Sequence, residues 1–189
     1  MNIARLFVII CWMWAASEVL LQVVTRTSRS RGAVKDRGSL LLLVSVIYGS
    51  IWACTQYGDT HARTMPGGAH SLKAVALVLL IVGLAIRWTA IITLGSSFST
   101  NVAIHVTQTV CKTGLFRWIR HPSYTGALVA LAAIGVNEGN GASLPIILVL
   151  PTAALIYRIH VEEMALIEAF GEEYVEYSKV TKRLVPGIY

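Results

Sequence analysis

Charged residues are scarce in this chain of 189 residues: they make up 14% of it, whereas hydrophobic residues make up 55%. Soluble domains usually carry about 25% charged residues, so the composition excludes an ordinary soluble enzyme or binding module. The apolar residues also come in long runs instead of the interrupted stripes of soluble helices, and the mean hydropathy is +0.64. The composition therefore indicates a membrane protein.

Cysteine is also rare, and its three residues suggest no disulfide framework, because Cys11 and Cys54 fall within apolar runs. The sequence has no histidine and cysteine cluster with metal-ligand spacing, no glycine-rich phosphate loop and no internal repeat. The net charge of +6 has a simpler origin in membrane topology than in nucleic-acid binding. We therefore expect no bound metal and no nucleic-acid partner.

Five apolar runs predict an all-α fold, a polytopic membrane bundle of about five transmembrane helices. The last two runs are joined by the turn-rich residues 137–141, which predicts a helical hairpin over residues 122–160. The fourth run is short, and whether it crosses the bilayer fully is left open. The expected spans are Ile3–Val24, Ser39–Tyr57, Leu72–Leu94, Pro122–Val136 and Ser143–His160.

The chain divides into residues 1–94, with three spans and a basic loop at 25–37, and residues 95–189, a catalytic half with a polar connection, the hairpin and a C-terminal helix and tail. The loop has one acid, Asp36, against its basic residues, so the positive-inside rule places it in the cytoplasm. The N-terminus is then outside, and the second half has its polar residues on the cytoplasmic face. The basic residues of the loop are Arg26, Arg29, Arg31, Lys35 and Arg37.

A first polar cluster, residues 114–124, leads directly into the fourth run. Pro122 is expected at the first position of a helix, where its missing N–H costs nothing. The backbone N–H groups of Ser123, Tyr124 and Thr125 would then be free to bind an anion at the positive end of the helix dipole. The alternative is that Arg120 and His121 only reach the lipid headgroups beside a helix cap.

A second cluster lies at the end of the fifth run, where Arg158, His160, Glu162 and Glu163 follow one another closely. Arg158 and Glu162 are four residues apart and share one helix face, whereas Glu163 points about 100° away. Ionisable residues at membrane depth usually mark function, although an ordinary ion pair at a helix end is the alternative. Beyond them, the apolar spacing predicts a separate helix over Glu162–Tyr177.

Together these clusters closely resemble the C-terminal half of the isoprenylcysteine carboxyl methyltransferases. The resemblance covers residues 94–186 and is carried by Arg120–Tyr124, Glu162–Glu163, Phe170–Tyr174 and Tyr177. It implies an integral membrane enzyme that transfers the methyl group of S-adenosylmethionine to a lipophilic substrate, leaving S-adenosylhomocysteine. It also implies a cofactor pocket that faces the cytosol and is closed by the C-terminal region.

The resemblance assigns roles residue by residue. Arg158 matches a family arginine for the substrate, and Glu162 matches the glutamate that holds the cofactor, so catalytic roles are predicted for both. The sequence departs from the family pattern at Gln108, where the family usually has histidine, and at Phe116, where tyrosine is common. The predicted cofactor-binding residues are Asn101, Gln108, Thr109, Val110, Cys111, Phe116, His121, Pro122, Ser123, Tyr124 and Glu162.

A carboxylate acceptor is ionised at neutral pH and needs no general base, so the reaction requires mainly alignment, a dry site and a cation that neutralises the carboxylate. Arg158 is the first candidate for that cation. Arg87, inside the third run, is the second candidate for substrate binding, and its alternative role is that of a snorkelling or helix-paired residue.

Three other functions remain open at this stage. A related phospholipid N-methyltransferase would need a base for its ammonium, for which His121 or Glu163 would serve. A membrane reductase that uses NADPH is the second alternative, because sterol reductases have a similar Arg-His-x-x-Tyr-x-Gly string, which Gly126 completes here. A noncatalytic membrane scaffold is the third.

Overall fold

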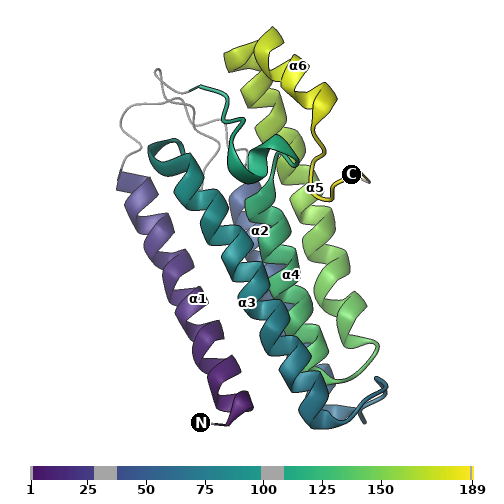
Figure 1. Ribbon diagram of the computed structural model, residues 1–189. Helices are drawn as coiled ribbons and strands as arrows, with labels where there is room; N and C mark the ends of the chain where they lie inside the picture. The colour runs from purple at the N-terminus through teal and green to yellow at the C-terminus, as the bar shows by residue number, and fades with distance from the viewer. Residues whose placement is uncertain (1, 28–37, 99–108, 188) are drawn as a thin grey trace.

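The computed structural model describes residues 2–27, 38–98, 109–187 and 189 (Figure 1). Within these residues the chain forms six α-helices and two short 3-10 helices, so the all-α prediction is confirmed. The elements are α1 (Ile3–Thr27), α2 (Ser39–Thr60), α3 (Ala69–Leu94), η2 (Gly95–Ser97), η3 (Gly114–Arg117), α4 (Pro122–Glu138), α5 (Ser143–Phe170) and α6 (Glu172–Val180).

Four of these helices, α1, α2, α3 and α5, are long and apolar enough to cross a membrane. Helix α4 has 17 residues, which corresponds to about 25 Å and is shorter than a hydrocarbon core of about 30 Å. The predicted hairpin is confirmed, because α4 and α5 lie side by side and are joined by residues 139–142. The basic residues of the loop at 28–37 lie outside the described residues.

The predicted separate helix over Glu162–Tyr177 is wrong in its boundaries. Helix α5 continues without a break to Phe170, and α6 begins only at Glu172. Gly171 separates them with a φ of 55°, a conformation that glycine adopts at little cost. Glu162 and Glu163 therefore lie on the last turns of a long helix, where the rigid backbone fixes them relative to Arg158.

The closest helix approach joins α3 and α4 and depends on two glycines. A Cβ atom added to Gly83 would lie 2.6 Å from the Ala130 nitrogen, and one added to Gly126 would lie 2.5 Å from the Gly83 oxygen. Membrane helices pack closely through such small residues because lipid provides no hydrophobic driving force between them. The backbones of α3 and α4 are therefore in direct contact where the polar start of α4 begins.

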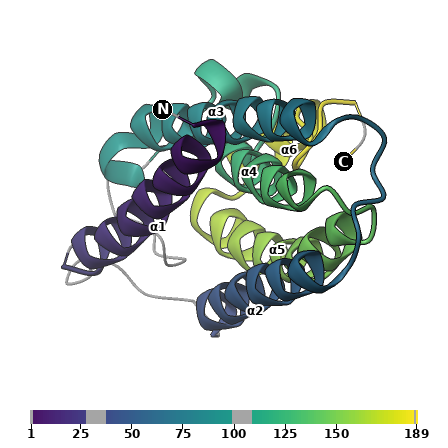
Figure 2. The same cartoon turned by 90° about the horizontal axis from the view of Figure 1, so that it is seen from below.

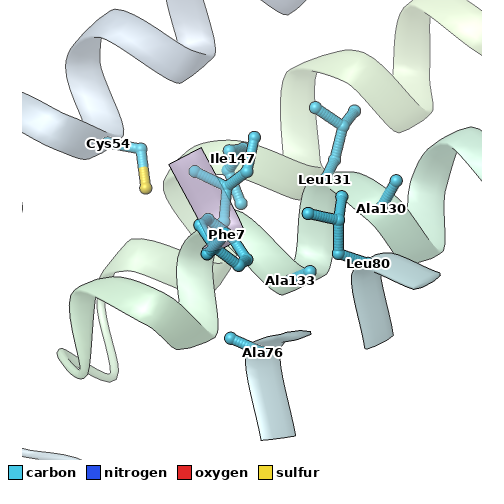
Figure 3. Close-up of a cluster of buried hydrophobic side chains, with 9 residues drawn as sticks. Phe7, Cys54, Ala76, Leu80, Ala130, Leu131, Ala133 and Ile147 are labelled. Carbon is cyan, nitrogen blue, oxygen red and sulfur yellow. The ribbon is translucent and has the colours of Figure 1, made fainter. Parts of the chain in front are cut away.

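The buried core lies towards the end of the bundle where α4 meets the α4–α5 turn, and it brings small side chains of α3 and α4 against larger ones (Figure 3). Phe7 inserts from α1 and Ile147 from α5. Many large apolar side chains instead face outwards, as expected for helices whose outer faces meet lipid. Seen from below in Figure 2, α2 lies along α5, whereas α1 lies at the edge of the bundle beside α3.

We expect Gly126→Ala to destabilise the bundle by about 1–3 kcal/mol, because the new methyl group would overlap the backbone of α3. The measurement is the thermal unfolding midpoint of the purified protein in detergent. Gly49→Ala is the matched control, because Gly49 lies in α2 with nothing within 4 Å of an added Cβ. Equal midpoints for the two variants would contradict the close contact of α3 and α4.

Candidate functional site

An apolar cavity of about 390 Å³ lies inside the bundle, and its walls are formed mainly by residues of α1, α2, α4 and α5. Its walls are mainly aliphatic and aromatic, but polar side chains gather where α4 begins. This end of the bundle, where α5 also leads into α6, is termed the site end. The polar groups that line the cavity there include Glu18, Arg87, Ser123, Tyr124 and Arg158.

The hydroxyl group of Tyr124 connects the two residues that the sequence analysis proposed as catalytic. It donates a hydrogen bond of 2.7 Å to Oε2 of Glu162 and accepts one of 3.0 Å from Nε of Arg158. Arg158 is buried and also donates from Nη1 to the Ser39 hydroxyl at 2.9 Å. Helices α2, α4 and α5 therefore all contribute to the position of the Arg158 guanidinium at the end of the cavity.

Glu162 and Glu163 are neighbours in sequence but have different surroundings. The Glu162 side chain is 30% exposed, against 9% for Glu163. Within the described part of the chain, Glu162 has no basic partner closer than Nδ1 of His121, which lies 3.8 Å from its Oε2. Oε1 of Glu162 makes no hydrogen bond there. Glu162 is thus the accessible carboxylate of the pair.

Glu163 holds a group of basic side chains, of which Arg120 and His121 are largely buried and Arg183 is 36% exposed. Nε of Arg120 donates to its Oε1 at 2.8 Å, and Nε and Nη2 of Arg183 donate to its Oε2 at 2.9 and 2.8 Å. Nε2 of His121 lies 3.4 Å from Oε1. The hydrogen bonds with Glu163 raise the pKa of Arg183 above its usual value. Arg120 and His121 therefore point into the protein, which contradicts the interpretation of them as headgroup residues.

The segment after α6 runs across the start of α4. The Arg120 and His121 N–H groups donate to the carbonyls of Lys182 and Arg183 at 2.7 and 3.0 Å. The Thr125 hydroxyl donates to the Leu184 carbonyl at 2.7 Å. Together with the ion pair of Glu163 and Arg183, these hydrogen bonds fix the tail over the first turn of α4.

The prediction of three free N–H groups at the start of α4 is wrong for two of them. The Tyr124 and Thr125 N–H groups both donate to the His121 carbonyl, at 3.0 and 3.2 Å. His121 is the N-cap residue, and its carbonyl accepts the first bonds of the helix in the ordinary way. The Ser123 N–H remains without a partner among the described residues. Pro122 is at the first helical position, as predicted.

The remaining predicted cofactor residues precede α4. Phe116 is buried in η3, and its carbonyl accepts a 2.6 Å hydrogen bond from the Tyr177 hydroxyl. Burial raises the pKa of Tyr177 to about 12, so it stays a neutral donor. Three other predicted residues, Thr109, Val110 and Cys111, do not line the cavity. Asn101 and Gln108 lie outside the described residues.

Arg87 lines the cavity, but it is a paired residue, as its alternative interpretation held. Its Nε and Nη2 donate to the two carboxylate oxygens of Glu18, and its Nη1 donates to the hydroxyl of Ser123 at 2.8 Å. Sequence reasoning did not select Glu18, although an acid within an apolar run is itself a signal of function. It also did not select Ser39 or Arg183, for which local patterns carry no signal.

We expect Glu163→Gln to lower the stability of the fold by about 3–5 kcal/mol, because it leaves the largely buried Arg120, and with it Arg183, without a carboxylate partner. Faster proteolysis of the tail beyond α6 should accompany the lower unfolding midpoint. The matched control is Glu173→Gln, which removes an exposed pair with Lys112 and should cost less than about 1 kcal/mol. If both variants have the same midpoint and tail cleavage, Glu163 does not fix the tail.

Comparisons with known proteins show which family this chain resembles in sequence and fold. The sequence profile of the isoprenylcysteine carboxyl methyltransferase (ICMT) family matches residues 75–168. A protein-S-isoprenylcysteine O-methyltransferase of Rattus norvegicus is 32% identical over 129 residues, which are 62% of this chain and 42% of the relative. The corresponding enzyme A of Arabidopsis thaliana is 35% identical over 114 residues, 59% of this chain and 58% of the relative.

A solved structure of the eukaryotic intramembrane Ras methyltransferase ICMT is also similar. It has a TM-score of 0.58 and 25% sequence identity, and the match covers 77% of this chain and 52% of that one. The chain thus spans about half the length of the relatives it matches, and its fold is that of an integral, multi-pass membrane protein. The helical bundle, the motifs at the site end and these matches lead to one conclusion: the chain belongs to the isoprenylcysteine carboxyl methyltransferase family.

Proposed function

We propose that this protein transfers a methyl group from S-adenosylmethionine to the carboxylate of a lipophilic, isoprenylcysteine-like acceptor in the membrane. One observation carries the proposal: the Tyr124 hydroxyl joins Arg158, at the polar end of an apolar cavity, to the accessible carboxylate of Glu162. A cation suited to an acidic acceptor and an anion suited to a cationic cofactor thus share one hydrogen-bonded group. The names of the relatives support the same chemistry.

The shape and charge of the cavity support an acceptor with an apolar chain and an acidic head. The walls are apolar along most of their length, and the volume of about 390 Å³ lies within the usual range for small-molecule sites. Arg158 stands at the polar end, and a guanidinium binds a carboxylate through two parallel hydrogen bonds. Arg158 is therefore proposed to bind the acceptor carboxylate, while Arg87, already paired with Glu18, supports the wall beside it.

The residues at the start of α4 and the end of α5 fit S-adenosylmethionine by their chemistry. Glu162 offers a partly exposed carboxylate for an ammonium or sulfonium group, and the Ser123 N–H is a donor for a carboxylate at a helix N-terminus. His121 and Tyr124, whose rings stack with centroids 5.6 Å apart, stand beside Glu162. These residues are proposed to hold the cofactor, with Pro122 fixing the start of the helix.

When bound, S-adenosylmethionine would supply an activated methyl group for transfer to a carboxylate oxygen, with S-adenosylhomocysteine as the other product. The residues of the chain then have three tasks. Arg158 binds and orients the acceptor carboxylate, and the apolar walls exclude water. Tyr124 fixes the side chains of Arg158 and Glu162 relative to each other through its two hydrogen bonds. The acceptor is already ionised at neutral pH, so no side chain has to remove a proton.

The same geometry argues against methylation of an amine. Such a reaction would need a base, and the two candidates for it were His121 and Glu163. The Glu163 carboxylate oxygens already accept hydrogen bonds from Arg120 and Arg183, and Oε1 also lies next to His121, so neither candidate is free to act as the base. Membership of a methyltransferase family argues equally against the reductase that uses NADPH.

We further propose that the site end faces the cytoplasm and that the N-terminus lies outside. Exposed basic residues gather at the site end, where they include Lys112, Arg117, Lys179 and Lys182. The basic stretch predicted at residues 25–37 begins in the last turn of α1, whose C-terminal end is also at the site end. Basic residues concentrate on the cytoplasmic side of membrane proteins, which supports this orientation.

We expect Glu162→Gln to weaken the binding of S-adenosylhomocysteine about 10- to 100-fold, because the variant loses a charge-assisted hydrogen bond but keeps its shape. Calorimetric titration of the purified protein measures this change. The matched control is Glu172→Gln, which changes an exposed glutamate at the start of α6. Unchanged affinity in a folded Glu162→Gln protein would refute the role of Glu162.

We expect Arg158→Lys to lower kcat/KM for a farnesylcysteine acceptor about tenfold or more, because lysine keeps the charge but lacks the planar fork of arginine. The dissociation constant of S-adenosylhomocysteine should change by less than about twofold. Steady-state kinetics and titration are compared with those of Arg117→Lys, which changes an exposed arginine. A loss confined to cofactor binding would move Arg158 to the cofactor side.

A further inference from the structure

Glu18 on α1 and Arg87 on α3 form an ion pair beside the site, and Glu18 lies outside the residues that the family profile matches. Both carboxylate oxygens of Glu18 accept hydrogen bonds from Arg87, and the two side chains are only 22% and 10% exposed. Nε1 of Trp14 donates a further hydrogen bond of 2.8 Å to Oε1 of Glu18. The family profile begins at residue 75, so it contains Arg87 but not Glu18.

The other edge of Arg87 contacts the first turn of α4. Its Nη1 donates to the hydroxyl of Ser123 at 2.8 Å and to the Ser123 carbonyl at 3.2 Å. This reach depends on the close approach of α3 and α4, because the position of a Cβ on Gly126 is 2.6 Å from the Arg87 nitrogen. One guanidinium therefore joins an acid on α1 to the residue that precedes Tyr124.

Helix α1 is the least buried of the four candidate spans among the described residues. Only 6% of its apolar span is buried. Phe7 inserts into the core near the N-terminal end, where Ile10, Cys11 and Trp14 also pack against it. Glu18 is about three turns beyond Phe7, towards the site end. In lipid there is no hydrophobic driving force that holds an apolar helix against its neighbours. An ion pair therefore contributes more to the position of α1 than it would in water.

We propose that Glu18 is a positioning residue, which acts through Arg87 to hold Ser123 and the first turn of α4 in the geometry that the site requires. Its carboxylate keeps the guanidinium turned so that Nη1 faces Ser123. It also holds the wall that α1 contributes to the cavity, which includes Trp14 and Glu18 itself. The effect expected on cofactor binding rests on the function proposed above, whereas the effect on α4 does not.

Removal of the Glu18 charge would affect first Arg87 and then the first turn of α4. Arg87 would be left with an uncompensated charge in an apolar bundle and would turn towards water or another acceptor. Ser123 would then lose its donor, and the first turn of α4 would open more often. Because Ser123 and Tyr124 are proposed to contact the cofactor, its binding would weaken although Glu18 does not touch it.

The test compares Glu18→Gln with Glu176→Gln, a control that removes the exposed ion pair to Lys179 on α6. Hydrogen exchange followed by mass spectrometry reports the opening of the first turn, residues 122–125, without any ligand, through the Tyr124 and Thr125 N–H groups that donate to the His121 carbonyl. We expect about tenfold faster exchange there in Glu18→Gln and no change in the control. Arg87→Lys, which keeps the charge but cannot bind Glu18 and Ser123 at once, should have the same effect and serves if Glu18→Gln does not fold.

A double-mutant cycle then tests whether Glu18 acts through Ser123. We expect about tenfold weaker binding of S-adenosylhomocysteine in Glu18→Gln, and the double variant with Ser123→Ala should lose little more than the larger single loss. Additive losses, or a lower unfolding midpoint with normal exchange at residues 122–125 and normal affinity, would overturn the proposal. If the unmodified protein binds no S-adenosylhomocysteine, the proposed function fails, and the exchange experiment alone decides the role of Glu18.

Discussion

Charged side chains inside an apolar bundle are stable only when an opposite charge or a full set of hydrogen bonds accompanies them, and the site end is built on this constraint. Glu163 is balanced by Arg120 and Arg183, and Glu18 is balanced by Arg87. Each pair joins elements that are distant in the sequence. The same interactions that make these charges tolerable therefore also fix the tail, α1 and the start of α4 relative to one another.

Two adjacent glutamates take different tasks because a helix turns by about 100° between them. Glu163 faces the interior, where its oxygens are used by the basic cluster. Glu162 is 30% exposed and accepts a hydrogen bond from the neutral hydroxyl of Tyr124, so its charge remains available. Glu163 therefore stabilises the fold, whereas Glu162 is proposed to bind the cofactor. Because Glu162 is not used by the basic cluster, it can accept the hydrogen bond from Tyr124, which in turn accepts one from Arg158.

Sequence patterns predicted the parts of this protein that depend on local composition. The first four apolar runs gave the bounds of α1, α2, α3 and α4 to within three residues, whereas α5 extends ten residues beyond the expected end at His160. Pro122 marked the start of α4 correctly. Both successes depend on the backbone and its immediate solvent. The spacing of Arg158 and Glu162 predicted that they share one helix face, but not that the Tyr124 hydroxyl connects them. A helix break at Gly171 was missed, because apolar spacing continues across it.

The long-range ion pairs could not be predicted from one sequence. Glu18 and Arg87 are 69 residues apart, and Glu163 and Arg183 are 20 apart on different elements. No periodicity links such residues, since their proximity depends on how α1 packs on α3 and on how the tail crosses the start of α4. The free N–H groups expected at the start of α4 were also fewer than predicted, because the N-cap carbonyl of His121 accepts two of them.

The central claim, methylation of a carboxylate at the end of an apolar cavity, is tested most directly by following the methyl group. The purified protein in lipid vesicles is given S-adenosylmethionine with a tritiated methyl group, together with a farnesylcysteine derivative and phosphatidylethanolamine. A methyl ester releases its label as methanol in mild alkali, whereas an N-methyl group does not. Alkali-releasable label on the farnesylcysteine derivative is the predicted result, and alkali-stable label on the amine lipid would contradict it.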